Sequence, residues 1–180
     1  MQLLFNYMSE NLENRMFARI STKAWLWYLI AIVVMLLDQI SKVFASANLV
    51  YGEPVTFTSF FNFTLLHNHG AAFSFLSEAG GWQRWFFAII AIVVSTVLVV
   101  WIGRSAEKNK SESLALAFIL GGAIGNLYDR IALGYVIDFI VVHFQDYHWP
   151  AFNLADSAIT IGAFILIVEI FLTKEKKSNA

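Results

Sequence analysis

The sequence predicts a mainly α-helical, polytopic membrane protein with four transmembrane helices and a small β-rich cradle outside the membrane. Three observations predict this fold class. Of the 180 residues, 58% are hydrophobic and only 14% are charged, and the mean hydropathy is +0.63, outside the range of ordinary soluble domains. Four segments are long and apolar enough to cross roughly 30 Å of hydrocarbon. Between the first two, apolar and polar residues alternate in part, as in strands.

The four spans are expected to belong to a single membrane-embedded domain that comprises residues 1–180. Aromatic residues such as Trp25, Trp82 and Trp101 mark their ends and fit an interfacial belt. A cleaved signal peptide is the alternative interpretation of the first span, but its polar lead is long and no small-residue cleavage site precedes a soluble domain. The predicted spans are about 24–44, 82–102, 114–133 and 153–172.

Basic residues predict the orientation, because Lys and Arg favour the cytoplasmic side of a membrane protein. They collect before the first span, between the second and third, and after the fourth. Both termini are therefore expected in the cytoplasm, with residues 45–81 and 134–152 outside. The residues concerned are Arg15, Arg19, Lys23, Arg104, Lys108, Lys110, Lys174, Lys176 and Lys177.

The outer segment 45–81 predicts short strands at the headgroup level, since open strand edges do not occur in the hydrocarbon. Gly52–Pro54 and the pair Gly80 and Gly81 are expected to form turns. The apolar residues that alternate in part with Thr and Ser are Val55, Phe57, Phe60, Phe61, Phe63 and Leu65.

Two aspartates carry the strongest functional signal. Asp138 and Asp156 lie in GYVIDFI and FNLADSAIT, where apolar segments meet short polar loops, and neither motif contains a basic residue. Ionisable groups at membrane depth usually mark function. Two carboxyl groups that approach each other share one proton, and so provide a general acid and a general base together. Water-mediated hydrolysis of an amide requires that combination.

Other polar residues fall at the same depth, in the outer half of the membrane. Asp38 and Lys42 are i,i+4 neighbours, and we expect a structural ion pair rather than a reacting group. Asp129 beside Arg130 is expected to form another structural or orienting pair. Gly122, Asn126 and Arg130 share one helix face, and Asn153 begins the fourth span with Asp156. Gly121 and Gly125 predict close approach of a helix or a substrate backbone.

Several other chemistries are disfavoured. The absence of cysteine excludes disulfides, thiolate metal sites and a cysteine nucleophile. Ser41 beside Lys42 points about 100° away from it on a helix, and no GxSxG motif occurs. Histidines lie in the outer segments, but no HExxH or similar spacing appears, so we expect no metal. These histidines are His67, His69, His143 and His148.

Five ordered motifs together resemble one family, lipoprotein signal peptidase, also called signal peptidase II. The resemblance covers nearly all of the chain from Asp38 to Ile159. The motifs are DQISK at Asp38 to Lys42, HNHGAAFS around Asn68, GGAIGNLYDR at Gly121 to Arg130, GYVIDFI around Asp138, and WPAFNLADSAI around Asn153 and Asp156.

The resemblance implies an aspartic endopeptidase of the bacterial cytoplasmic (inner) membrane. Such an enzyme removes signal peptides from prolipoproteins, on the amino side of a diacylglyceryl-modified cysteine. It implies Asp138 and Asp156 as the catalytic dyad near the outer, periplasmic face. Partners would be the lipid-modified signal peptide and membrane lipids; we expect no cofactor, no nucleic acid and a monomer. Supporting or substrate-binding positions would be Asp38, Lys42, Asn68, Gly122, Asn126, Arg130 and Asn153.

Two other function classes remain open from the residues alone. Intramembrane Asp, Lys, Arg and Asn at one depth also describe a proton- or cation-coupled transporter. Four spans without an inverted repeat are unusual for such a transporter. A non-enzymatic assembly factor is the third interpretation.

Overall fold

Four long helices form the body of the part of the chain that the structure describes. The structure is a computed structural model that describes residues 21–70, 81–145 and 147–178. The helices are α2 (Ala24–Asn48), α3 (Trp82–Ser105), α4 (Lys110–Ala132) and α5 (Leu154–Ser178). Each contains a stretch apolar and long enough to cross a membrane, which confirms the four predicted spans. The first ends four residues later than expected, and the third begins four residues earlier.

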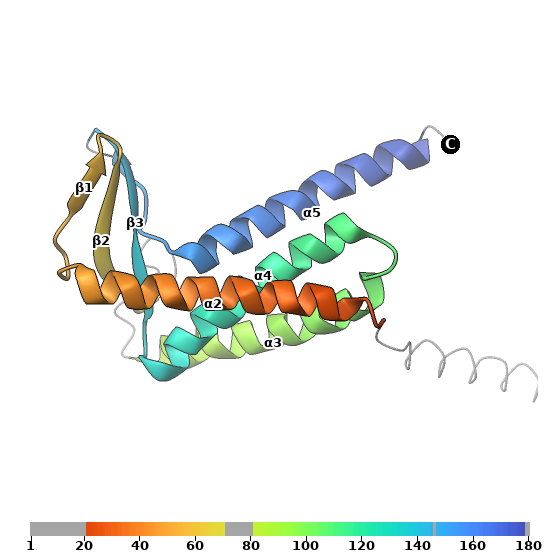
Figure 1. The fold of residues 1–180 in the computed structure, drawn as a ribbon, viewed down its shortest axis with the longest axis horizontal. Coiled ribbons are helices and arrows are strands. Elements are labelled where there is room, and N and C mark those ends of the chain that lie inside the picture. Colours follow the sequence, from red (N-terminus) through yellow and green to blue (C-terminus); the bar gives the residue numbers. More distant parts are fainter. Residues whose placement is uncertain (1–20, 71–80, 146, 179–180) are drawn as a thin grey trace, which may run out of the picture.

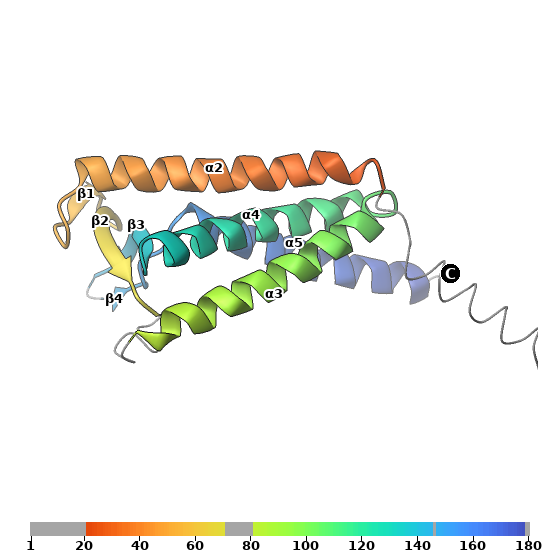
Figure 2. The same ribbon diagram turned by 90° about the horizontal axis from the view of Figure 1, so that it is seen from below.

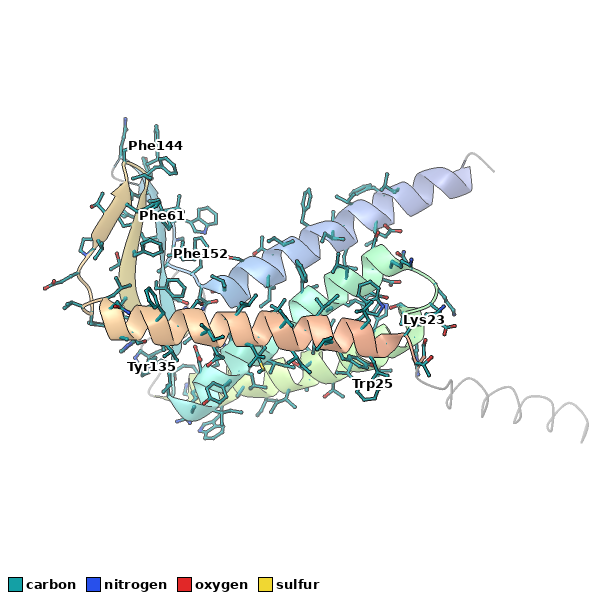
Figure 3. All side chains as sticks on the ribbon, viewed as in Figure 1. Lys23, Trp25, Phe61, Tyr135, Phe144 and Phe152 are labelled. Atoms are coloured by element: carbon teal, nitrogen blue, oxygen red, sulfur yellow. The ribbon has the colours of Figure 1, made fainter. Side chains whose placement is uncertain are left out.

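The helices run in alternating directions along one axis. The start of α2 and the end of α5 both lie at the end of the bundle away from the sheet (Figures 1 and 2). Figure 3 places Lys23 and Trp25 at this end, whereas Phe61, Phe144 and Phe152 lie at the other. The predicted cytoplasmic residues Arg15 and Arg19 lie outside the described residues. The predicted basic residues of the tail, from Lys174 onward, have no described side chains.

Helix α4 is the central helix of the bundle. In its most apolar 18-residue stretch, 56% of the residues are buried, against 17–22% in the corresponding stretches of the other three helices. A Cβ at Gly121 would lie 2.5 Å from the carbonyl oxygen of Ala31 on α2, and one at Gly122 would meet the carbonyl oxygen of Ala155 on α5. Adjacent residues on a helix point about 100° apart, so these glycines let α2 and α5 pack closely on two neighbouring faces of α4. Of the two predicted roles, helix packing is the one the structure uses.

A four-stranded antiparallel sheet covers one end of the bundle, with strand order β1-β2-β3-β4. Strands β1 (Val55–Thr58) and β2 (Phe61–Asn68) confirm the strands predicted in the outer segment. Gly52 has a φ of +78° in the turn before β1, as the GEP sequence predicted. Gly80, the first residue of the other predicted turn, lies outside the described residues.

The sheet also contains strands that the sequence analysis did not predict. Residues 134–152 were expected only as an outer connection, yet β3 (Val136–Phe144) is the longest strand and pairs with β2, and β4 (Tyr147–His148) follows it. Most of β3 is buried, so its sequence is mainly apolar apart from Asp138 and His143, without the alternation that marks a half-exposed strand. This strand carries Asp138 into the protein.

Two contacts fix the sheet to the helices. Ala45 at the end of α2 packs in one buried cluster with Leu65 of β2 and Phe139 of β3. Before α5, Phe152 donates its N–H to the carbonyl oxygen of Ile140 (3.0 Å) and accepts the N–H of Ile140 in return (2.9 Å). The first turn of α5 is therefore held beside the middle of β3.

Candidate active site

Asp138 lies in the buried part of β3, with 2% of its surface exposed. Asn68 donates from Nδ2 to its Oδ2 (3.0 Å), and Asn153 donates from Nδ2 to its Oδ1 (2.7 Å). Leu66 of β2 is directly opposite Asp138, and Asn68 is two residues further along, on the same face of the sheet. The strand pairing thus explains why Asn68 reaches this carboxyl group.

Asp156 is part of a reciprocal cap at the start of α5. Asn153 accepts the N–H of Asp156 at its Oδ1 (2.9 Å), and Asp156 accepts the N–H of Asn153 at its Oδ2 (3.3 Å). This is the arrangement of a capping box, in which two otherwise unpaired donors of the helix start are satisfied. Asn126 of α4 donates to the remaining oxygen of Asp156 (2.8 Å). Both carboxylate oxygens are therefore held.

One buried amide joins the two aspartates. Asn153 is fully buried, and its Nδ2 contacts Asp138, the carbonyl oxygen of Ile137 (3.2 Å) and Oδ1 of Asn126 (3.2 Å). The same residue caps Asp156. Asp138 and Asp156 are therefore brought together by β3 and the first turn of α5, with Asn153 between them.

The environment of Asp138 favours its protonated form. Burial raises the pKa of Asp138 from its ordinary 3.8 to about 7, and the negative charge of nearby Asp156 adds to the increase. Hydrogen bonds from Asn68 and Asn153 act in the opposite direction but do not offset burial. Near neutral pH Asp138 therefore carries a proton in a large part of the molecules, as the acid of a coupled acid and base requires.

The raised pKa leads to an expected pH dependence of stability. Between about pH 4 and pH 7 the folded chain keeps a proton on Asp138 that the unfolded chain has lost, so Asp138 makes stability fall as pH rises through this range. Asp138→Asn removes this effect. As pH rises from 4 to 7, we expect the unfolding free energy of this variant to increase relative to that of wild type by up to about 4 kcal/mol. Thermal unfolding of both proteins in detergent from pH 4 to 8 measures this difference. A stability difference that does not change with pH would contradict the prediction.

A second buried group of polar residues is connected to Asp156 through Asn126. We call it the Lys42 cluster, and Lys42 is at its centre with 1% of its surface exposed. Its Nζ lies 2.8 Å from a carboxylate oxygen of Asp38 and 2.8 Å from one of Asp129, and it donates to Oδ1 of Asn126 (2.9 Å). The predicted Asp38–Lys42 pair is confirmed. The members of the cluster are Asp38, Gln39, Lys42 and Asp129.

The predicted pairing of Asp129 with Arg130 is wrong. Asp129 pairs with Lys42 of α2 instead, because adjacent residues on a helix point about 100° apart and face different neighbours. Arg130 donates to the carbonyl oxygen of Gly70 (3.2 Å) and lies over the ring of Phe87. Gly70 in turn donates its N–H to Asn68 (3.0 Å), so Arg130 is linked to Asn68 through Gly70.

The predicted site residues lie at one end of the bundle. Asn126 bonds to Asp156, Asn153 and Lys42, and Gly122 packs one helix turn away against Ala155. The HNHGAAFS motif is described only as far as Gly70, so its last four residues lie outside the described residues. The sequence analysis missed Gln39, whose Nε2 donates to both Asp38 (3.2 Å) and Asp129 (3.0 Å). Its place beside Asp38 in DQISK was the available signal.

Histidine rings stack in two separate places, once on a tyrosine and once on another histidine. His67 stacks on Tyr135 with ring centroids 4.0 Å apart, and His143 stacks on His148 at 5.3 Å. Burial and the neighbouring His69 lower the pKa of His67. In the parts of the chain that the structure describes, no group of three or more His, Asp or Glu side chains is arranged to hold a metal ion.

Comparisons with known proteins point to one family. The family model for signal peptidase (SPase) II matches residues 30–172. The chain belongs to the signal peptidase II family. It is 61% identical to the lipoprotein signal peptidase of Cellvibrio japonicus, over 86% of this chain and 91% of that protein. It is 58% identical to that of Teredinibacter turnerae, over 84% and 90%.

Solved structures agree with the fold of this signal peptidase II chain. A bacterial membrane enzyme determined by the in meso method at 2.3 Å resolution is 33% identical and has a TM-score of 0.76, over 84% of this chain and 91% of that one. A second, determined at 1.9 Å resolution, is 34% identical with a TM-score of 0.70, over 81% and 92%. Membership of a protease family confirms the resemblance seen in the five motifs and leaves the transporter interpretation without support.

Proposed function

We propose that this chain is a membrane aspartic endopeptidase that removes signal peptides from diacylglyceryl-modified prolipoproteins. The cut is on the amino side of the lipidated cysteine, and Asp138 and Asp156 are the catalytic pair. The observation that carries this proposal is the junction of the two carboxyl groups through Asn153, at the end of the bundle that the sheet covers. Membership of the signal peptidase II family supports the reaction class.

The reaction follows from one shared proton. Asp138, whose pKa is raised to about 7, holds the proton at rest and donates a hydrogen bond to the scissile carbonyl oxygen. Asp156 takes a proton from a water molecule as the water oxygen attacks the carbonyl carbon. The tetrahedral intermediate breaks at its C–N bond, and Asp156 gives the proton that it took from water to the leaving nitrogen, which restores its carboxylate. The products are a signal peptide with a new carboxylate and a lipoprotein with a free cysteine amino group.

Asn68 is the candidate to contact the substrate beside the dyad. It is half-buried, whereas Asn153 is fully buried, so Asn68 lies on the more accessible side of Asp138. Its Nδ2 already points at Asp138, and its Oδ1 accepts from Gly70. An amide held at both ends can stabilise developing negative charge without reorganising.

Apolar burial should provide most of the binding. The apolar stretch of a signal peptide would lie as a further helix against the bundle, and the acyl chains would contact lipid-facing surfaces. The faces of Gly121 and Gly122 are occupied by α2 and α5, so the substrate must use another surface. We place the site at the periplasmic face with both termini in the cytoplasm, following the distribution of basic residues.

The test compares a lipid-modified precursor peptide with the same peptide lacking the lipid, both with purified full-length protein in detergent. Each buried CH₂ contributes about 0.8 kcal/mol, so kcat/KM should be at least about 100-fold higher for the lipidated peptide. Mass spectrometry identifies the cleaved bond. Equal rates for both peptides would remove lipid recognition from the proposal, and a cut elsewhere would contradict the assigned bond.

A further inference from the structure

The two carboxyl groups of the Lys42 cluster are linked to the dyad through the backbone. Asp129 accepts the N–H of Ile137 at its Oδ2 (3.1 Å), and Asp38 accepts the N–H of Ala155 at its Oδ1 (2.9 Å). Ile137 immediately precedes Asp138, and Ala155 immediately precedes Asp156. Each carboxyl group that flanks Lys42 thus binds the residue just before one aspartate of the dyad.

We infer that Asp129 and Asp38 are positioning residues that set the separation of the two catalytic aspartates. Lys42 holds both carboxyl groups, so a single cation connects the segment that carries Asp138 with the segment that carries Asp156. This inference rests on the proposed function of the dyad. It assigns to Asp129 a role in catalysis through Asp138, without contact to the substrate.

The connections are short and stiff. Consecutive Cα atoms are about 3.8 Å apart across a planar peptide, so a fixed N–H at Ile137 or Ala155 leaves the next Cα little freedom. Asp38, Lys42 and Asp129 are each at most 1% exposed, so water does not compete for these bonds. A displacement of about 1 Å at a reacting group can reduce a rate about 100-fold.

The partners of Asp129 require a carboxylate at this position. Its Oδ2 contacts Lys42 and the N–H of Ile137, and its Oδ1 accepts from Gln39. All three are donors. An asparagine here would keep one acceptor for Ile137 but would turn its own NH₂ group toward another donor.

A pair of glycine variants tests the Asp38 connection without changing any charge. A Cβ at Gly125 would lie 2.5 Å from Oδ2 of Asp38, the movable end of a side chain. A Cβ at Gly121, one turn earlier on α4, would meet the backbone oxygen of Ala31 and the side chain of Val34. The two variants crowd the same pair of helices, but only Gly125→Ala displaces Asp38.

The two variants should rank in opposite orders for the loss of kcat and for the loss of melting temperature. Gly125→Ala should lower kcat about tenfold or more with KM within about twofold of wild type, whereas Gly121→Ala should lower the melting temperature more and kcat less. Kinetics on the lipid-modified peptide and thermal unfolding measure both. A kcat for Gly125→Ala equal to that of Gly121→Ala would overturn the positioning role of Asp38.

Substitutions of Asp129 test the other connection. We expect Asp129→Ala to lower kcat about 100-fold and Asp129→Asn about tenfold, with little change in KM, because the asparagine retains one acceptor for Ile137. If the alanine variant does not fold, Asp129→Asn, which is nearly the same size, decides the question. A wild-type kcat in folded Asp129→Asn would overturn the role of Asp129.

Asp138→Asn and Asp156→Asn separate this inference from the proposed function. Cleavage that survives in either variant would reject the dyad itself. Loss of cleavage in both, together with wild-type kcat in Asp129→Asn and Gly125→Ala, would reject only the positioning role.

Discussion

Asp138→Asn and Asp156→Asn should each abolish cleavage of a lipid-modified precursor, with kcat reduced at least about 10³-fold. A positioned acid or base contributes roughly 10² to 10⁴ in rate, and each aspartate of the pair would serve in both steps of the reaction. Neither substitution changes the size of the side chain, so the main contacts affected are the hydrogen bonds from Asn68 and Asn153 to Asp138 and from Asn126 to Asp156. Purified variants assayed in detergent, with unfolding curves beside them, measure the loss.

Glu53→Gln is the matched control for the dyad variants. Glu53 is an exposed carboxylate in the turn before β1, so the same chemical change there should leave kcat within about twofold of wild type. A chelator added to wild-type enzyme should have no effect if water is activated by carboxylates alone. Inhibition by the chelator, or retained cleavage in one aspartate variant, would contradict the two-carboxylate mechanism.

Lys42→Met should strongly destabilise the folded protein. The change leaves Asp38 and Asp129 without the ion-pair partner they share at 2.8 Å, and both carboxyl groups are almost completely buried. Breaking a buried ion pair by removing one partner costs about 3–5 kcal/mol. In a chain of this length we expect the melting temperature to fall by about 10 °C. Thermal unfolding in detergent measures it.

The same substitution at the other end of α2 provides the comparison. Lys23 is exposed, so Lys23→Met should change the melting temperature by no more than a degree or two. Equal melting temperatures for the two variants would mean that the buried carboxyl groups are satisfied without Lys42.

The parts of the site that the sequence predicted are those with a local signal. The pair Asp38 and Lys42 is visible as i,i+4 spacing, and the packing role of Gly121 and Gly125 as a small-xxx-small pattern. Asn153 and Asp156 are three residues apart, and the structure shows why this spacing matters: they form the capping box of α5. Each of these features depends on neighbours within one helix.

The parts that the sequence did not predict depend on distant segments. The partner of Asp129 is Lys42, 87 positions earlier in the chain, and nothing in the helix containing Asp129 identifies it. The first four residues of β3, Val136–Phe139, are buried on both faces, so this part of the strand lacks the alternation of apolar and polar residues by which strands are recognised. The contact of Asn68 with Asp138 follows only from the pairing of β2 with β3.

The bond between Asp38 and Ala155 joins positions 117 residues apart, and this separation affects how the protein becomes active during synthesis. A chain emerging from the ribosome inserts its helices from the N-terminus onward, so Asp38 enters the membrane first and Asp156 with the last helix. Until α5 arrives, Asp138 has neither its partner carboxylate nor the amide of Asn153. With Asp138 and Asp156 as the proposed catalytic pair, we therefore expect a chain that has not yet inserted α5 to have no proteolytic activity.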